Sequence, residues 1–305
     1  MFDSIWQDIK SEFRIGNMIT RLVIINVSVF VFVNLVKLFI TLGTGFKQPD
    51  GTQTHFEKFI SWFALSSDWV YDLTHPWVFF TSMFLHVGFM HILFNMLFLY
   101  WFGRIVGDLI GDKKILPLYL LGGLTGAFIF VALSQAINIG NPAYGASAGV
   151  MAIVVASGLL APDFIIRLLF LGEVRLKYIV MVILFIDLMG IGSMSNTGGH
   201  FAHLGGALMG WFFVFNLKNG TDIGEPINKM NDSVAGFFKK QKMTVAYKNE
   251  NKSRFKRNQK PHAVSDDSPS YEEQLDAILD KIKLKGRSSL TKEEEAFLEK
   301  ASNKK

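Results

Sequence analysis

The 305-residue chain has no cysteine, and its first two thirds carry few charged residues. The absence of cysteine excludes disulfide bonds, thiolate metal sites and a cysteine nucleophile. The net charge of +5 is modest, and the basic residues gather on segments expected to face the cytoplasm. Membrane orientation explains them better than nucleic-acid binding does. The N-terminus also lacks the pattern of a cleavable signal peptide.

Hydrophobic residues make up 50% of the chain, and phenylalanine alone occurs 29 times. This is too apolar for a soluble domain of this length, and the excess ends near Leu217. The composition predicts an amphipathic N-terminal segment over residues 1–20 and a membrane domain over 21–217. A juxtamembrane segment and linker over 218–270 and a small cytoplasmic helical hairpin over 271–305 would follow.

Both ends of the chain show helical spacing of apolar residues. The N-terminal segment is expected to lie on the membrane surface as an amphipathic helix. In the tail, apolar residues from Leu275 to Ile282 recur at i, i+3, i+4 and i+7, and Thr291 with Glu294 has the pattern of a capping box. Two short helices are predicted there, without a catalytic constellation.

Six segments are apolar enough to cross a bilayer, which takes roughly 20 residues. An all-α polytopic membrane protein with six transmembrane helices is therefore predicted. The expected spans are 22–42, 78–102, 116–137, 143–161, 176–191 and 198–217.

Lysine and arginine predict how these spans are oriented. Basic residues precede the first span, follow the second, and separate the fourth from the fifth. By the positive-inside rule both termini are cytoplasmic. Ser147, in the fourth span, and His203, in the sixth, then lie at similar depth in the outer half of the membrane. We expect a multi-pass protein of a cell membrane, with a bacterial inner membrane as the expected location.

Ser147 and His203 are polar residues inside apolar stretches, where such residues are costly and mark function by default. Gly199, His203, Gly206 and Gly210 form one stripe on a helix, and glycines allow a neighbouring helix to approach closely. The alternative is that the glycines only pack helices and that Ser147 bonds to its own helix. Together, the serine and the histidine stripe favour a nucleophile and its base.

The second expected span adds candidate oxyanion donors. His91 and Asn95 are four residues apart and share a helix face, so both could point at one atom. Such donors stabilise a developing oxyanion, and the Ser147 backbone N–H is a natural third. His86 lies off that face, and a role in bracing a loop is expected for it. His200 carries no assignment.

A metal site is the competing chemistry, because four histidines fall in two segments. The sequence has no HExxH motif and no carboxylate in either histidine segment, so a zinc site is disfavoured. The nearest intramembrane acid, Asp187, belongs to the fifth expected span. We expect neither a metal nor any other cofactor.

The motifs resemble those of the rhomboid intramembrane serine proteases. The run from Met83 to Asn95, the Gly-Ala-Ser-Ala-Gly around Ser147, and Ala202-His203-Leu204-Gly205-Gly206 all look like that family. The resemblance covers about residues 15–217. It implies a six-helix rhomboid-like bundle in which a Ser–His dyad cleaves transmembrane substrates, without an acidic third member or a cofactor.

By this resemblance, Ser147 is the nucleophile, His203 is the general base, and His91 and Asn95 line the oxyanion hole. Two positions depart from the family pattern. Ala148 follows the nucleophile where glycine is usual, and its methyl group could crowd the turn. Val78 follows Trp77 where arginine is common, which weakens any claim about an arginine-anchored first loop.

The predicted function is that of a serine endopeptidase acting in or near transmembrane segments, with membrane proteins as substrates, the lipid bilayer as its surroundings and no nucleic-acid partner. One alternative is a catalytically silent relative that binds membrane clients. Another is a transporter or channel, which would call for charged midplane residues, broken helices or repeated halves. No internal repeat is found.

Overall fold

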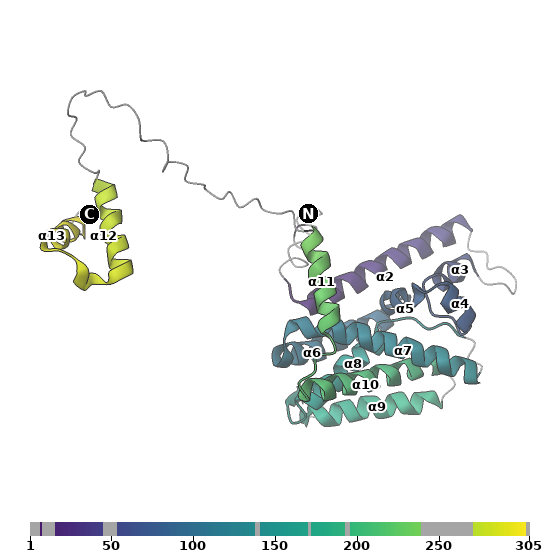
Figure 1. The fold of residues 1–305 in the computed structure, drawn as a ribbon. Helices are drawn as coiled ribbons and strands as arrows, with labels where there is room; N and C mark the ends of the chain where they lie inside the picture. The colour runs from purple at the N-terminus through teal and green to yellow at the C-terminus, as the bar shows by residue number, and fades with distance from the viewer. Residues whose placement is uncertain are drawn as a thin grey trace. The chain divides into compact units, whose positions relative to one another are not determined.

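The computed structural model shows a chain that is mostly helical and that divides into two compact units, residues 1–241 and 242–305 (Figure 1). The N-terminal amphipathic helix and the linker predicted from sequence lie largely outside the described residues. The structure describes residues 7, 16–44, 54–137, 141–169, 172–192, 196–238 and 271–302.

Long helices build the first unit, and short ones fill the first connection. The elements in chain order are α2 (Met18–Gly43), α3 (His55–Ser61), α4 (Trp69–Thr74), α5 (Val78–Thr81), η1 (Ser82–Phe84), α6 (Phe89–Ile110), η2 (Asp112–Lys114), α7 (Ile115–Ile137), α8 (Ser147–Leu160), α9 (Leu176–Ile191), α10 (Thr197–Lys218) and α11 (Glu225–Phe238). A two-stranded antiparallel hairpin of β1 (Ile165–Leu168) and β2 (Gly172–Arg175) joins α8 to α9, with Ile165 opposite Arg175.

Three stretches of the described chain are long and apolar enough to cross a membrane, namely Met18–Gly43, Phe89–Ile110 and Asp112–Ile137. The helix α8 is apolar but has only 14 residues. The helices α9 and α10 match the bounds of the fifth and sixth expected spans within one residue. The helical fold is therefore confirmed, while the number of six spans stays a prediction.

The second expected span begins at the wrong residue. It was expected over 78–102, but the chain forms α5 and η1, becomes extended at Leu85, and starts α6 only at Phe89. Gly88 caps this helix with extended backbone angles. Hydropathy continues through this break, because Met83 of η1 and the extended residue Leu85 are both buried. His86 consequently lies before the helix that carries His91 and Asn95.

Glycines set the distance between α7, α8 and α10, which lie side by side in the middle of the unit (Figure 1). A Cβ atom on Gly206 would lie 2.0 Å from the Ala148 carbonyl oxygen, and one on Gly210 would lie 2.3 Å from the Ala152 oxygen. The predicted glycine seam between α8 and α10 is present at these two positions. Gly199 instead faces Asn196, at the start of its own helix.

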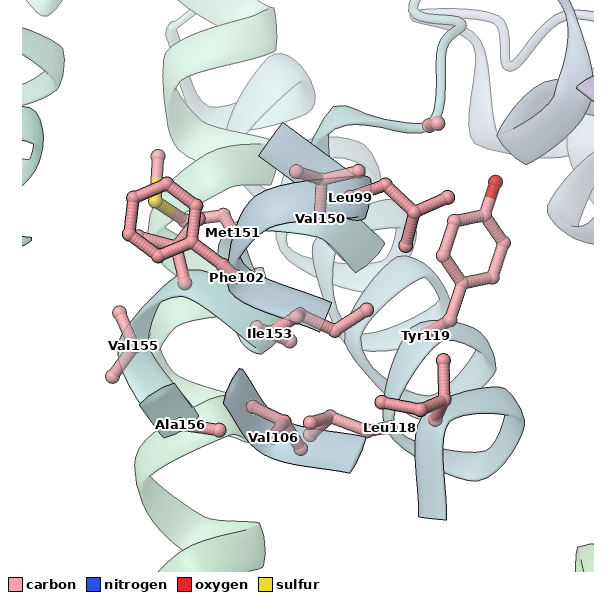
Figure 2. Close-up of a cluster of buried hydrophobic side chains, with 14 of the residues drawn as sticks. Leu99, Phe102, Val106, Leu118, Tyr119, Val150, Met151, Ile153, Val155 and Ala156 are labelled. Carbon is pink, nitrogen blue, oxygen red and sulfur yellow. The ribbon is translucent and has the colours of Figure 1, made fainter. Parts of the chain in front are cut away.

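The main core forms where α6 and α7 meet α8 (Figure 2). Leu99 and Val106 from α6, Leu118 from α7 and Ile153 from α8 are all fully buried. Tyr119 closes one edge of this cluster, and its hydroxyl donates to the Met83 carbonyl at 2.8 Å. The core thereby ties the irregular segment before α6 to α7.

Aromatic side chains organise the connection between α2 and α6. Trp62 and Trp77 stack with ring centroids 6.3 Å apart, and the Trp77 indole N–H donates to the Trp62 carbonyl at 2.8 Å. His75 stacks on Tyr71 at 4.0 Å. Trp62 and Trp77 are both more than 40% exposed, as expected for aromatic residues at a membrane interface.

The second unit contains two helices, α12 (Tyr271–Lys285) and α13 (Lys292–Ser302). Thr291 and Glu294 form the predicted capping box, with Thr291 N–H donating to the Glu294 carboxylate at 2.7 Å. Lys281 of α12 pairs with Glu294 at 2.7 Å. The predicted pair of short helices is therefore present.

Candidate active site

Four hydrogen bonds hold the turn that leads into Ser147, the first residue of α8. Ala143 and Leu65 exchange two backbone hydrogen bonds of 3.0 Å, and Gly145 N–H donates to the Ser82 carbonyl at 2.8 Å. The buried Ala146 N–H donates to Nε2 of His86 at 3.2 Å. Ser147 is thereby placed at a helix N-terminus, where backbone N–H groups lack helical partners.

Gly145 is required by the shape of this turn. Its φ of +129° disfavours any residue with a side chain, and a Cβ atom there would lie 2.6 Å from the His91 ring. The methyl group of Ala148, which departs from the family motif, has its own space beside Gly126 of α7. A Cβ on Gly126 would lie only 2.5 Å from that methyl group. The alanine therefore does not crowd the turn before Ser147.

His203 projects from α10 and contacts α9 as well as the space beside Ser147. Its Nδ1 lies 2.6 Å from Oδ1 of Asp187, and Nδ1 of His200 lies 2.7 Å from the same oxygen. Asp187 is only 6% exposed. The expectation that the histidine has no acidic partner is therefore wrong for this structure.

A signal for this contact existed in the sequence. Two antiparallel helices joined by a short connection bring together residues equally distant from its centre. Asp187 precedes position 195 by eight residues and His203 follows it by eight, while Gly190 and His200 are each five away. Both pairs are in contact in the structure.

Ser147 and His203 line the same cavity, which has a volume of about 430 Å³. Several of its other lining residues are polar: Ser82, His91, Asn141, Tyr144 and Asn196. A second cavity of about 370 Å³ shares Ser147, His91 and His203, but its remaining walls are mainly apolar and include Met90, Phe94, Phe98, Val150 and Val154. The structure therefore brings the predicted nucleophile and base to one site.

No hydrogen bond joins Ser147 to His203 within the described residues. Among these residues, the Ser147 hydroxyl and Nε2 of His203 have no hydrogen-bond partner, and both side chains face the cavity. Catalytic hydrogen bonds are often long in the absence of substrate and tighten in the Michaelis complex.

His86 and Asn95 form a buried network behind the cavity. The Asn95 side-chain amide donates to the His91 carbonyl at 2.9 Å and contacts Nε2 of His86 at 3.3 Å. Nδ1 of His86 lies 3.3 Å from the Phe84 carbonyl, so Nδ1 carries the proton and Nε2 accepts. The role in bracing a loop that was expected of His86 fits this arrangement. Both amide hydrogens of Asn95 are thus engaged.

The His91 ring differs from Asn95 in having no hydrogen bond among the described residues. It packs edge-on against His86, with ring centroids 5.0 Å apart, and lies against Gly145. It lines both cavities. The two predicted oxyanion donors therefore differ. Among the described residues, the side-chain amide of Asn95 is engaged in hydrogen bonds, whereas the ring nitrogens of His91 are not.

Asp187, His200 and His203 could also hold a metal ion, since their candidate ligand atoms lie within 4.8 Å of one another. This set of two imidazoles and one carboxylate was not anticipated from the sequence. The two hydrogen bonds to Asp187 account for the arrangement without an ion.

Comparison with known families agrees with these motifs and this geometry. The Rhomboid domain family matches residues 73–219, from the end of α4 to the end of α10, and this region includes Ser147, His203 and most of the residues that line the cavity. The chain is a rhomboid family protein. The resemblance noted in the sequence is thereby confirmed, and the apolar helices make this a multi-pass membrane protein. Residues 267–304 match a family of unknown function, DUF6576.

Several curated rhomboid relatives resemble part of this chain. Presenilin-associated rhomboid-like protein A, mitochondrial, of Danio rerio is 27% identical over 44% of this chain and 35% of its own length. Rhomboid protease GluP of Bacillus subtilis is 29% identical over 45% of this chain and 25% of its own length. RHOMBOID-like protein 12, mitochondrial, of Arabidopsis thaliana is 30% identical over 46% of each chain. The chain thus spans less than half the length of these relatives.

Proposed function

We propose that this rhomboid protein is an intramembrane serine endopeptidase that cleaves membrane proteins in or near their transmembrane segments. Ser147 is its nucleophile and His203 its general base. The observation that carries the proposal is that both side chains face one polar cavity, the serine from the start of α8 and the histidine from α10.

His203 is suited to act as a base because of the contact on its other side. Nδ1 is engaged by Asp187, so Nε2 is the nitrogen left for the Ser147 proton. Both groups already border the same cavity, so they can approach one another within it. Nucleophile and base then need to reach about 2.6–3.2 Å in the substrate complex.

The start of α8 and the His91 ring supply the oxyanion site in this proposal. The Ser147 N–H is at the first position of a 14-residue helix, whose dipole favours negative charge there. His91 borders the same space. Asn95 also faces the second cavity, but it must release a hydrogen bond in order to donate. We therefore assign a larger share of the oxyanion stabilisation to His91 and the Ser147 N–H than to Asn95.

The two cavities suit the two components of the reaction. The polar cavity would hold the water that hydrolysis needs. The apolar cavity, walled by Phe94 and Val154 among others, would receive the hydrophobic part of an unwound substrate helix. Ser147 and His203 stand where the two cavities share walls.

The reaction follows from these positions. Ser147 Oγ attacks the substrate carbonyl carbon while Nε2 of His203 takes the hydroxyl proton. The tetrahedral oxyanion is held by the donors described above. His203 then gives the proton to the leaving amine, and the C–N bond breaks to leave an acyl-enzyme. A water molecule, deprotonated by His203, releases the acid and restores Ser147.

The orientation and location complete the proposal. With both termini in the cytoplasm, as the basic residues predict, the polar cavity opens toward the outer face. Substrates are membrane proteins that share the bilayer with the enzyme, and no nucleic acid takes part. The names of two relatives place them in mitochondria, and the bacterial inner membrane stays a prediction for this chain.

A fluorophosphonate probe tests the proposal, because it labels only an activated serine. We expect labelling of the detergent-solubilised full chain and its complete loss in Ser147→Ala. Ser82→Ala is the matched control, since Ser82 is a second hydroxyl residue lining the same cavity. That variant should retain its labelling.

Two results would count against the protease. Labelling that persists in Ser147→Ala would mean that another group reacts. Absence of labelling from folded wild-type protein would favour the alternative, a catalytically silent rhomboid that binds membrane clients.

A further inference from the structure

Asp187 is the buried carboxylate nearest to the candidate active site, and it does not line the cavity. It lies behind His203, 6% exposed, on a helix that otherwise presents mainly apolar side chains. A charged group in such surroundings is costly unless it is paired. Its Oδ1 meets Nδ1 of His203 at 2.6 Å and Nδ1 of His200 at 2.7 Å.

The contact selects one form of the His203 ring. A carboxylate oxygen can only accept, so Nδ1 of His203 must be the donor and carry the proton. The neutral ring then has its lone pair on Nε2, on the side of the cavity. Without the carboxylate, the opposite tautomer would place a proton where a base needs a lone pair.

His200 lies between α9 and α10, away from the cavity that His203 lines. Its ring lies on Gly190 of α9, where a Cβ atom would be 2.3 Å from Cε1 and Nε2. This ring therefore fills the space between α9 and α10 and holds Asp187 in place. His203 reaches the cavity, and His200 does not line it.

We propose that Asp187 is a positioning residue that fixes His203 in the tautomer and orientation needed to deprotonate Ser147, so that this rhomboid works with a Ser–His–Asp arrangement. This inference rests on the proposed protease function. Asp187 acts through His203 and does not touch the substrate. In a soluble serine protease triad, replacing the aspartate by asparagine costs about 10⁴-fold in kcat, because the wrong tautomer results.

Few other groups could take over this role. Among the described residues, the titratable ones around His203 are Asp187 from α9, His200 from its own helix, His91 from α6 and Tyr144 from the turn before α8. The sequence of α8 has no titratable side chain, and that of α7 has only Tyr119. Asp187 is the one acid among them.

The test measures the rate of fluorophosphonate labelling of the full chain between pH 5 and pH 9. We expect Asp187→Asn to fold and to label about 10²-fold to 10⁴-fold more slowly. The acidic limb of its pH profile should also change position, because the His203 ring loses the carboxylate that fixes its tautomer. Asp187→Glu retains a carboxylate, so it should label faster than Asp187→Asn, and its acidic limb should lie closer to that of the wild type.

Two further variants distinguish the positioning of His203 by Asp187 from the packing of α9 against α10. His200→Gln removes the other donor to Asp187 and should leave the acidic limb in place even where the rate changes. Asp163→Asn removes an exposed carboxylate that binds Lys177 near the start of α9 and should leave the whole profile unchanged. If the acidic limb moves as far in His200→Gln as in Asp187→Asn, the positioning role is overturned. The movement would then result from altered packing between α9 and α10.

The remaining outcomes are distinct. Wild-type labelling with an unchanged Asp187→Asn profile overturns the positioning role and leaves the protease intact. Absence of Ser147-dependent labelling in the wild type overturns both. Labelling that EDTA abolishes and Zn²⁺ restores would show that Asp187, His200 and His203 bind a metal, which also overturns the inference. Indifference to EDTA supports it.

Discussion

The helices α8 and α9 are neighbours in sequence but are packed in opposite ways. Nearly every residue of α8 is buried, and glycines of α7 and α10 approach it at backbone distance. In α9 only Leu176, Val180 and Asp187 are buried, and its other large apolar side chains are mostly exposed. Ser147, the proposed nucleophile, lies on the enclosed helix, and Asp187, behind the proposed base His203, lies on the peripheral one.

This contrast separates two requirements of the site. The serine must meet backbone donors at a fixed distance, and an enclosed helix provides that rigidity. The aspartate needs only to reach His203 and His200 across one seam, which α9 can do while the apolar side chains on its outer side stay exposed. The position of the proposed base, His203, should therefore be more sensitive than that of Ser147 to changes at the α9–α10 seam.

The largest loss of stability is expected from a substitution where α10 touches the backbone of α8. Gly206→Ala places a methyl group 2.0 Å from the Ala148 carbonyl oxygen, so the two helices must separate. We expect a loss of about 4 kcal/mol in the free energy of unfolding, above the usual 1–3 kcal/mol of overpacking, because backbone atoms cannot rotate away. Reversible unfolding in mixed detergent micelles measures it.

Gly107→Ala is the matched control, because a Cβ atom there meets nothing within 4 Å. Alanine is favoured over glycine inside a helix by roughly 0.5–1 kcal/mol, so this variant should be as stable as the wild type or slightly more stable. Equal destabilisation by both changes would refute the account of close packing.

A pair of isoleucines compares the two helices directly. Ile153 of α8 is fully buried, whereas Ile186 of α9 is 65% exposed. We expect Ile153→Ala to cost about 3 kcal/mol through lost contacts and the cavity left behind. Ile186→Ala should stay within about 0.5 kcal/mol. The same unfolding measurement applies, and similar losses at the two positions would remove the distinction between α8 and α9.

Much of the fold was predictable because apolar length is a strong signal. The bounds of α7, α9 and α10 follow from hydropathy within a residue or two. The start of α6 was not predictable in this way. Val78, Met83 and Leu85 of this stretch are apolar because they are buried by other helices, and hydropathy alone does not separate short buried helical turns and extended residues from one continuous helix.

The site was predictable in its residue types but not in its hydrogen bonds. Ser147, His203 and His91 share a cavity as the motifs suggested. The bond from Ala146 to His86 joins positions 60 residues apart, and no local pattern reports such a contact. Asp187 was set aside because it lies in another segment, although its distance from the α9–α10 connection matches that of His203.

The smallest predicted effect is a change of thermal stability with pH, and it concerns a second buried carboxylate, in the connection between α2 and α6. Asp72 is fully buried, and only its Oδ1 is bound, by the Ser66 N–H at 2.8 Å. Its Oδ2 has no partner in the described part of the chain. Burial raises the pKa of Asp72 to about 6. The Oδ2 of Asp187 also has no partner among the described residues, but its Oδ1 meets two imidazoles, whereas the Oδ1 of Asp72 has one backbone donor.

The sign of the pH effect follows from this raised pKa. Between its ordinary value of 3.8 and about 6, the folded protein binds the proton more tightly than the unfolded chain. Stability therefore falls as pH rises through that window. Asp72→Asn keeps an acceptor for Ser66 and removes the charge, so its thermal midpoint should not show this fall. We expect the wild type to lose about 2–4 °C relative to the variant between pH 4 and pH 7.

Glu57→Gln provides the control, because Glu57 is an exposed carboxylate in the same connection, where it caps α3. Intrinsic fluorescence reports on the region, since Trp62, Trp69 and Trp77 all lie within it. The wild type and Glu57→Gln should share one pH dependence, and Asp72→Asn should depart from it. Parallel curves for all three proteins would mean that folding does not raise the pKa of Asp72.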